Sequence, residues 1–389
     1  MRVTTGALLL GLLIVGALPA QSLKAPAPSR IGGKSLEEWK KDLSSEDASR
    51  RAYAIIAITQ FGEAASSCVP AIIDRLKDGD VSPRARALGA LRTMSIDEKD
   101  IDRVVRAVAA RLVPAQESQA VIRYEATITL NRFVTDGQGA ISNLIVATMD
   151  KSSWEIRHNA VSLLWRIGVG MGQEDSPPDQ RIVEALLTSL RNDRTYQVRL
   201  ETIQGLGALG RPANPMLLAK LVSELKLCAV HPNKPLAIWA YCGLVAMEDG
   251  KPAEQSLNTL AKFVKSQDLE TRIQAATALG ALRDKAKSKV PLLVDMLKDK
   301  EPYAVQAGAS ALGALGEAGE NVISALLDLT DDKDPITAAS AVAALVNLKQ
   351  NNTRVVGMLE KMREKKDLDL RLRYTIEEGL KELRAPKKK

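Results

Sequence analysis

One segment of this 389-residue chain recurs throughout its length, and this repetition restricts the fold more than any other feature. Its clearest copies are Val198-Arg199 leading to Leu206-Gly207-Ala208-Leu209-Gly210, and Arg272 leading to Leu279-Gly280-Ala281-Leu282. We call the position of the arginine the anchor. Successive anchors are 33 to 42 residues apart, at Arg51, Arg84, Arg123, Arg157, Arg199, Ala237, Arg272, Val305, Ala338 and Arg373. A sustained period of this length is typical of stacked units rather than of one globular core.

The residues that follow each anchor predict a helix. Every copy has a large apolar residue seven and ten positions after its anchor, and most have alanine three positions after it. These three offsets fall on one helical face, and the alanine lets a neighbouring helix approach closely. The residues seven positions on are Ile58, Leu91, Leu130, Leu164, Leu206, Leu244, Leu279, Leu312, Leu345 and Leu380. Those ten positions on are Phe61, Met94, Phe133, Ile167, Leu209, Met247, Leu282, Leu315, Leu348 and Leu383.

A second apolar helix fits between each anchor helix and the next anchor, for example over 182–190, 290–297 and 323–329. One such hairpin cannot bury its apolar stripe alone, whereas a stack of hairpins can. The sequence therefore predicts nine helical hairpins and a terminal half-repeat. An acid often stands four residues before the anchor, where it can cap the anchor helix. These acids are Asp47, Asp80, Asp268, Glu301, Asp334 and Asp369.

Composition agrees with an all-α stack. Apolar residues make up 46% of the chain but aromatic residues only 3%, so alanine and leucine must supply most of the buried surface. Both residues have high helix propensity. No segment shows the sustained alternation of apolar and polar residues that predicts a strand.

The N-terminus has the features of an export signal. Arg2 supplies a positive charge, Ala7–Leu18 an apolar core, and Ala20 a small residue at a cleavage site. The apolar run is shorter than the ~20 residues of a membrane-spanning helix, so we expect cleavage rather than a retained anchor. The mature protein is then periplasmic or secreted, without integral membrane association.

Local composition predicts the other boundaries. Proline and glycine favour a flexible linker after the signal, and Ser35 and Glu38 form a capping-box pattern at the start of a short helix. The predicted segments are a signal peptide at 1–20, a linker at 21–34, an N-terminal capping helix at 35–44, the repeats at 45–383, and a basic disordered tail at 384–389.

The repeat resembles the HEAT-repeat family, specifically its phycobilisome-lyase-like branch. The matching positions are the anchor arginine, the acid before it, the alanine and the two Leu-Gly pairs. The resemblance covers roughly residues 45–383. It implies a right-handed α-α superhelix of the HEAT/armadillo-like solenoid type. It also implies a ladder between the arginines and acids of adjacent repeats, broken at Ala237, Val305 and Ala338, where the arginine is missing.

Sequence motifs for catalysis and cofactors find no support. Gly205 to Gly210 matches GxGxxG, but this motif binds dinucleotides only between a strand and a helix, and here it ends an anchor helix. The two histidines, His158 and His231, cannot form a multi-histidine metal centre. We expect no catalytic site, no cofactor and no metal.

Several features have two interpretations. Cys228 and Cys242 flank a loop and could form a disulfide in an oxidising compartment. The four tryptophans are expected to pack in the core or between repeats rather than to stack on a ligand. Residues 169–180 and 229–235 lengthen two connections. They are either tolerated insertions or partner contacts, and we favour insertions.

The function most consistent with these features is an exported, non-enzymatic scaffold that binds a protein or acidic polymer on the concave face of the solenoid. Second helices are expected to line that face, with the basic residues Arg75, Arg106, Arg111, Lys220, Lys262 and Lys298. The net charge of +7 favours an acidic partner but equally fits a solubilising surface. Lyase-like or chaperone activity by family analogy, and nucleic-acid binding, are the alternatives, and export opposes both. The oligomeric state stays open.

Overall fold

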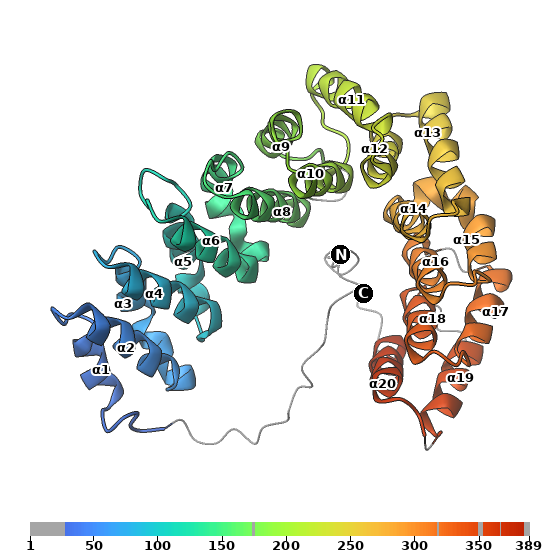
Figure 1. Cartoon of the computed structure of the whole chain (residues 1–389). Coiled ribbons are helices and arrows are strands. Elements are labelled where there is room, and N and C mark those ends of the chain that lie inside the picture. Colours follow the sequence, from blue (N-terminus) through green and yellow to red (C-terminus); the bar gives the residue numbers. More distant parts are fainter. Residues whose placement is uncertain (1–27, 173–175, 317–318, 349–352, 366, 385–389) are drawn as a thin grey trace. The chain divides into compact units, whose positions relative to one another are not determined.

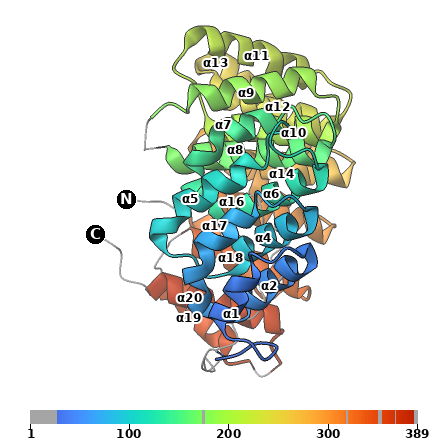
Figure 2. The same cartoon turned by 90° about the vertical axis from the view of Figure 1, so that its left-hand side faces the viewer.

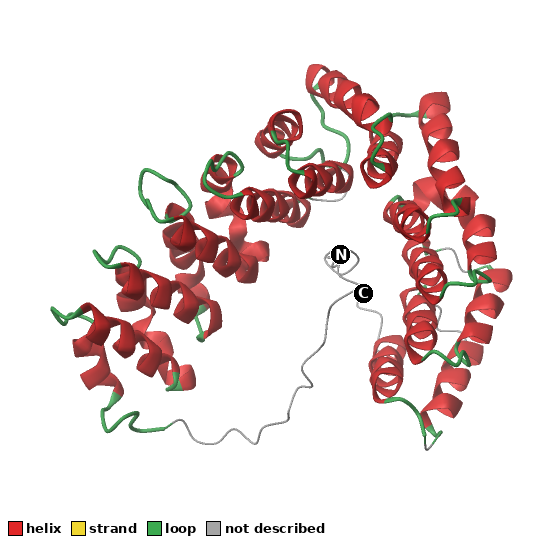
Figure 3. Ribbon diagram, in the orientation of Figure 1, coloured by secondary structure: helices red, strands yellow, loops and turns green. Residues whose placement is uncertain are grey.

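The computed structural model describes residues 28–172, 176–316, 319–348, 353–365 and 367–384. The predicted signal peptide, the linker up to residue 27 and the tail from residue 385 lie outside the described residues. The described residues form helices and connecting loops, with one isolated bridge between Ile31 and Lys34 in place of any strand (Figure 3). They divide into two compact units, which we call unit 1 (residues 1–213) and unit 2 (residues 214–389) (Figure 1).

Unit 1 begins with one short helix and continues with the helical hairpins in chain order (Figure 2). The short helix is α1 (Leu36–Asp42), and the anchor helices are α2 (Ala48–Thr59), α4 (Val81–Thr93), α6 (Ala120–Leu130), α8 (Trp154–Met171) and α10 (Tyr196–Leu209). The second helices are α3 (Val69–Arg75), α5 (Glu98–Ala110), α7 (Ile141–Ala147) and α9 (Gln180–Asn192). Two 3₁₀ helices, η1 (Gly62–Cys68) and η2 (Asn131–Ala140), lead from an anchor helix into a second helix.

Unit 2 continues the same pattern and ends on an anchor helix. Its anchor helices are α12 (Lys234–Met247), α14 (Leu269–Ala281), α16 (Pro302–Leu315), α18 (Pro335–Asn347) and α20 (Leu370–Arg384). Its second helices are α11 (Pro215–Ala229), α13 (Gly250–Lys262), α15 (Val290–Met296), α17 (Glu320–Leu329) and α19 (Thr353–Arg363), with η3 (Phe263–Lys265) and η4 (Arg283–Lys289) as short 3₁₀ segments. The predicted all-α stack of about nine repeats is confirmed. Most second helices, however, pack against the anchor helix that follows them, as α3 packs on α4 and α19 on α20, rather than against the one before.

Each unit has two layers of helices. In unit 2 the anchor helices α14, α16, α18 and α20 contact one another in sequence and form one layer, and the second helices lie beside them (Figure 1). In unit 1 the anchor helices from α2 to α10 likewise contact one another in sequence. This arrangement follows from the hairpin, because each hairpin returns the chain to the start of the next anchor helix in the same orientation.

The anchor helices of a unit approach one another closely because small residues face each other. A Cβ atom on Gly313 would lie 2.8 Å from the Cα of Ala344, and one on Gly280 would lie 3.0 Å from the Cα of Ala311. Where a stack of two helical layers curves, the layer with the closer helix spacing lies on the concave side. Within each unit the inner layer is therefore the anchor layer, and our expectation that second helices line the concave face is wrong.

The predicted core positions are buried. All ten residues seven positions after the anchors are at most 2% exposed. The residues ten positions on are buried as well, except Leu209, which is half-buried at the end of α10. The GxGxxG match lies in this same helix, where Gly205 accommodates the ring of Trp165. The structural interpretation of that motif is confirmed.

The N-terminal helix is fixed by both its cap and the turn before it. Ser35 and Glu38 form the expected capping box at the start of α1. Residues 28–34 fold back as a turn, in which the indole N–H of Trp39 donates to the carbonyl of Ile31 at 2.8 Å. The sequence prediction of a linker over 21–34 did not anticipate this turn.

The two long connections differ from their predictions. Helix α8 continues to Met171, so part of the first connection is helical. At the second, α11 extends to Ala229 and Asn233 caps α12, which leaves only the short loop 230–233 between them. The extra length of that repeat is therefore in a longer helix rather than in a loop.

The cysteines and most tryptophans lie in the interior. Cys68, Cys228 and Cys242 are buried, and the structure contains no disulfide between the last two. Burial raises the pKa of Cys242 to about 12. Trp39 and Trp239 are buried, and the half-buried Trp165 donates to Glu201 at 2.8 Å, as expected for packing residues. Trp154 is the exception, because 38% of its surface is exposed.

Candidate protein-binding surface

The anchor arginines position the helices by joining consecutive turns. Arg123 shows the arrangement: its guanidinium donates to the carbonyls of Glu117 and Ser118, in the turn before its own helix, at 2.8 and 2.9 Å. The same side chain donates to the carboxylate of Asp150 in the next turn at 2.7 Å. Each arginine of this kind links its own turn to the following one, which fixes the spacing of adjacent anchor helices.

The acid in these links stands six or seven residues before the next anchor. In unit 1 the links are Arg51–Asp78, Arg84–Glu117, Arg123–Asp150 and Arg157–Asp193. Unit 2 has the link Arg272–Asp299. The family resemblance placed the ladder acid four residues before the anchor, and that assignment is wrong for most repeats. Those acids mostly cap helices, as Asp47 caps α2 and Asp334 caps α18.

Each ladder acid also shapes its own turn. Asp150 accepts the backbone N–H of Ser152 at 2.8 Å, and Asp78 accepts that of Asp80 at 3.0 Å. Burial alone would raise the pKa of Asp150, but hydrogen bonds from Arg123 and Ser152 outweigh it, so the pKa lies below its ordinary value. The pKa values of Asp78 and Asp193 are lowered by the same balance of burial against hydrogen bonds from Arg51 and Arg157.

The ladder is interrupted in unit 2, as predicted. Asp332 holds its turn by accepting the backbone N–H of Asp334 at 2.8 Å. At the anchor one repeat earlier, however, Val305 replaces the arginine that would pair with Asp332. Ala237 and Ala338 interrupt the pattern in the same way.

The six basic residues predicted for the concave face lie in or beside second helices. Arg75 ends α3, Arg106 is exposed on α5, Arg111 follows α5, Lys220 is on α11, Lys262 ends α13, and Lys298 follows α15. They belong to both units and to the layer opposite the anchor helices. Arg75, Arg106 and Arg111 belong to unit 1, and Lys220, Lys262 and Lys298 to unit 2.

Three of these six residues are committed to local contacts, and one of them is Arg75, which forms an ion pair with Asp78 at 3.2 Å. Arg111 is only 8% exposed, and it donates to the carbonyl of Gln116 at 3.1 Å. Burial lowers the pKa of Arg111. Arg106 forms an ion pair with Asp102 at 2.8 Å, one helical turn away. Arg111 is a packing residue rather than a partner-binding one.

The anchor layer, in contrast, exposes most of the scarce tyrosines. The chain has six tyrosines and four tryptophans. Large exposed aromatic residues occur only on anchor helices among the described residues: Tyr53, Tyr124, Trp154, Tyr196, Tyr303 and Tyr374. All lie between three residues before and two residues after their anchor. Sequence reasoning treated the aromatic residues as packing residues and missed this surface.

In unit 1 exposed residues of this kind occur on every anchor helix, and we call them the aromatic ridge. Each of the five consecutive anchor helices contributes at least one exposed large apolar residue, between 36% and 56% exposed. The ridge residues are Tyr53 on α2, Val81 on α4, Val121 and Tyr124 on α6, Trp154 on α8, and Tyr196 on α10. Their offsets from the anchors differ from those of the buried face, in agreement with their exposure.

The ridge offsets carry charges of both signs, with Glu125, Glu155 and Glu201 as well as Arg86. Arg86 on α4 occupies the position that Tyr53 occupies on α2, two residues after the anchor, and it is exposed. The structure gives Arg86 no hydrogen bond or ion pair within the described residues. Nearby Arg50 pairs with Asp42 at 2.8 Å, and Arg92 pairs with Glu125 at 3.1 Å. Arg86 is therefore available to an anionic group.

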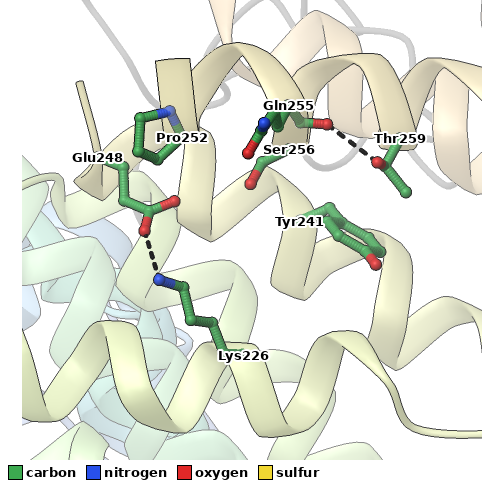
Figure 4. A pocket seen from close by; sticks show the side chains of 7 residues that line it. All are labelled: Lys226, Tyr241, Glu248, Pro252, Gln255, Ser256 and Thr259. Carbon is green, nitrogen blue, oxygen red and sulfur yellow. Dashed lines mark hydrogen bonds and ion pairs between the residues drawn. The ribbon is translucent and has the colours of Figure 1, made fainter. Parts of the chain in front are cut away.

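A small pocket in unit 2 does not compete with the ridge as a site. It is lined by residues of α11, α12 and α13 and by Glu248, and has a volume of about 160 Å³ (Figure 4). An ion pair between Lys226 and Glu248 at 2.9 Å lies along one side of it. Ligand pockets are usually about 300–1,000 Å³ and mainly apolar, so this hollow is too small and too polar for a typical organic ligand.

The described part of the chain has no cluster of three or more histidine, cysteine, aspartate or glutamate side chains arranged to bind a metal ion. None of its helices is both long and apolar enough to span a bilayer.

Comparison with known proteins identifies the repeat unit. The family model described as HEAT repeats matches residues 225–313 and 257–346, which both lie in unit 2. Residues 225–346 carry HEAT repeats. The fold is accordingly an all-α, HEAT-like solenoid. The narrower likeness to the phycobilisome-lyase branch finds no support in this match.

Solved structures similar to this chain include an engineered protein and importin beta. An engineered protein from a structural genomics consortium is 18% identical, with 90% of this chain and 98% of the other covered and a TM-score of 0.44. Importin beta is 15% identical, with 89% of this chain and 50% of the other covered and a TM-score of 0.45. The chain thus spans half of the importin chain. No curated protein matches the sequence.

Proposed function

We propose that this HEAT-repeat protein is an exported, non-enzymatic scaffold that binds another protein through the anchor layer of unit 1. The aromatic ridge is the observation that carries the proposal. Exposed tyrosine and tryptophan are enriched at protein interfaces because they combine apolar area with hydrogen-bonding capacity. Contiguous exposed apolar surface on a soluble protein also marks interaction sites.

The distribution of aromatic residues supports binding rather than stability. Leucine and alanine fill the core, whereas Tyr53, Tyr124 and Trp154 leave more than a third of their surface in solvent. The rigid ladder beneath them holds the ridge in shape before a partner arrives. Pre-organisation of this kind lowers the entropic cost of association.

Export remains part of the proposal because it rests on the sequence of residues 1–20. In a bacterial host, the expected product is a mature chain that begins at Gln21 in the periplasmic or secreted fraction. Mass spectrometry of the N-terminal peptide tests this directly. A cytoplasmic protein that keeps residues 1–20 would contradict it.

Site-specific photo-crosslinking tests the binding surface. A photoreactive phenylalanine analogue is placed at Tyr124 on the ridge or at Val146, which is 45% exposed on the second helix α7. We expect a discrete protein crosslink in native fractions only from position 124. Charge reversal at Arg106 and Lys262, in the opposite layer, should leave that crosslink unchanged. Equal crosslinking from both positions, or none from position 124, would refute the assigned surface.

A further inference from the structure

Helices α8 and α10 of unit 1 pack side by side (Figure 1) and bring three aromatic side chains and one carboxylate together. Trp154 and His158 meet edge-on at 6.2 Å between ring centroids. The Nε2 atom of His158 lies 3.8 Å from the carboxylate of Glu201, and the indole N–H of Trp165 donates to the same carboxylate at 2.8 Å. We call these four residues the α8–α10 cluster.

All four members of the α8–α10 cluster remain partly exposed to solvent. Trp154 is 38% exposed, and the side chains of His158 and Glu201 are 33% and 18% exposed. The indole of Trp165 donates to one carboxylate oxygen of Glu201, Oε1, and the other oxygen accepts no hydrogen bond within the described residues. The carboxylate is thus held in place by one donor and can accept a second donor from a partner.

We infer that the α8–α10 cluster binds an arginine or lysine side chain from a basic segment of the partner protein. A cation is attracted to the face of an indole ring within about 6 Å of the ring centroid. A carboxylate beside the ring adds a charge-assisted hydrogen bond. The cluster supplies both groups, because Glu201 contacts two of its three aromatic side chains. This inference rests on the proposed function and specifies the chemistry of the partner at one part of the ridge.

A second carboxylate beside the cluster favours the same partner. Glu155 follows Trp154 on α8 and accepts a hydrogen bond from the hydroxyl of Ser153 at 2.6 Å. This bond and one from its own backbone N–H lower the pKa of Glu155, so its side chain is anionic at neutral pH. Neither Glu155 nor Glu201 forms an ion pair with a lysine or arginine within the described residues. The free cation of the ridge, Arg86, lies two anchor helices away on α4.

The cations nearest in sequence to the cluster have other partners or lie outside it. The anchors Arg157 and Arg199 are both engaged in other contacts. Arg166 donates to the first side chain of η2 at 2.5 Å. Lys151 and Arg194 stand in the turns before α8 and α10 rather than on the helices. The cluster therefore carries negative charge, although the whole chain has a net charge of +7.

Titration of the full mature chain with a cationic peptide tests the inference. The probe is (Arg-Gly-Gly)4, and the control peptide carries citrulline, a neutral side chain of the same shape, in place of each arginine. Isothermal titration calorimetry should show that the arginine peptide binds at least about tenfold more tightly than the citrulline peptide. Non-specific attraction cannot produce this result, because a chain with a net charge of +7 repels a cationic peptide.

Paired substitutions then locate the binding site. Glu201→Gln keeps a hydrogen-bond acceptor but removes the charge, and Trp154→Leu keeps apolar bulk but removes the aromatic ring. Each should weaken binding of the arginine peptide by at least about fivefold. The matched controls are Glu125→Gln, at the same offset on α6 but already paired with an arginine of α4 at 3.1 Å, and Tyr53→Leu on α2. Both controls should change the affinity by less than about twofold. Circular dichroism of each variant checks that the fold is intact.

Two results would overturn the inference. One is equal affinity of the wild-type protein for the arginine and citrulline peptides, including no measurable binding of either. The other is an equal loss of affinity from the cluster substitutions and their matched controls. If photo-crosslinking at Tyr124 still captures a protein in that case, the scaffold function stands and only the basic segment is wrong. If crosslinking fails as well, both proposals fail.

Discussion

Arg283 adopts a backbone conformation that three other repeats reserve for glycine. It has φ of 49°, the only positive value for a non-glycine residue among the described residues. Eleven residues after their anchors, Gly62, Gly210 and Gly316 have φ values of 61°, 81° and 68° at the same place. The chain therefore turns out of its anchor helix with a positive φ in each case, but a side chain at this position adds strain.

Replacement of this arginine should relieve that strain. Arg283→Gly is expected to stabilise unit 2 by up to about 1 kcal/mol, because the relief of roughly 1–2 kcal/mol exceeds the entropic cost of glycine. Urea denaturation of both proteins measures the change. Gly316→Ala, which introduces a side chain at the equivalent turn, is the opposite control and should destabilise. A lower midpoint for Arg283→Gly would contradict this account.

The ladder acids differ in whether they pair with a buried arginine, and this difference can be measured as a change in the free energy of unfolding. Asp150 pairs with Arg123, which is only 4% exposed, so Asp150→Ala leaves a buried cation and should cost about 3–5 kcal/mol. Asp332 has the same place in its turn, but Val305 replaces the arginine. Asp332→Ala should cost about 1 kcal/mol or less. If chemical denaturation shows the same loss of stability for both variants, the link between Arg123 and Asp150 adds no stability.

At the scale of the helix, the sequence predicted the repeats well because the buried positions recur at the same offsets from each anchor. The residues seven and ten positions after each anchor are buried in nearly every copy, and seven of the ten copies share the alanine three positions on. These offsets specify the helix, its buried face and the hairpin without any knowledge of tertiary contacts.

The inner layer, the ladder acid and the ridge required three-dimensional information. The acid four residues before the anchor is a local feature that fits a helix cap, whereas the ladder acid binds an arginine about 30 residues earlier, such as Arg51 with Asp78. The ridge did leave a signal in the sequence. Tyr53, Tyr124 and Trp154 stand at offsets that the buried face does not use, and a search for aromatic residues outside the buried offsets would have found them.

Glycine in these helices has two opposite roles, and one pair of substitutions separates them. Gly313 on α16 faces the backbone of α18, so Gly313→Ala should push the helices apart and destabilise unit 2 by about 1–3 kcal/mol. At Gly89 on α4, an added Cβ would meet no atom within 4 Å, so Gly89→Ala should stabilise unit 1 by about 0.5–1 kcal/mol. Thermal denaturation of each variant gives the signs. If both substitutions shift the melting temperature in the same direction, helix propensity alone determines their effect on stability.

Across the whole molecule, the buried carboxylates make stability depend on pH. The pKa values of Asp78, Asp150 and Asp193 are lowered in the folded protein. Their contribution is complete above the unfolded value of about 3.9 and is lost as the pH falls through the folded values. The melting temperature should therefore drop steeply below about pH 4. Asp150→Asn should lower it at pH 7 but flatten the acid dependence, and an unchanged slope would exclude this residue as a source.

The uneven ladder also has a mechanical meaning. In unit 1 four successive links tie each turn to the next, so a stretching force must rupture a charge pair before two neighbouring hairpins can separate. In unit 2 the hairpins that begin at Ala237, Val305 and Ala338 lack the arginine that would make this link. Unit 2 would then stretch and recoil at lower load, while unit 1 keeps the spacing of its ridge under tension.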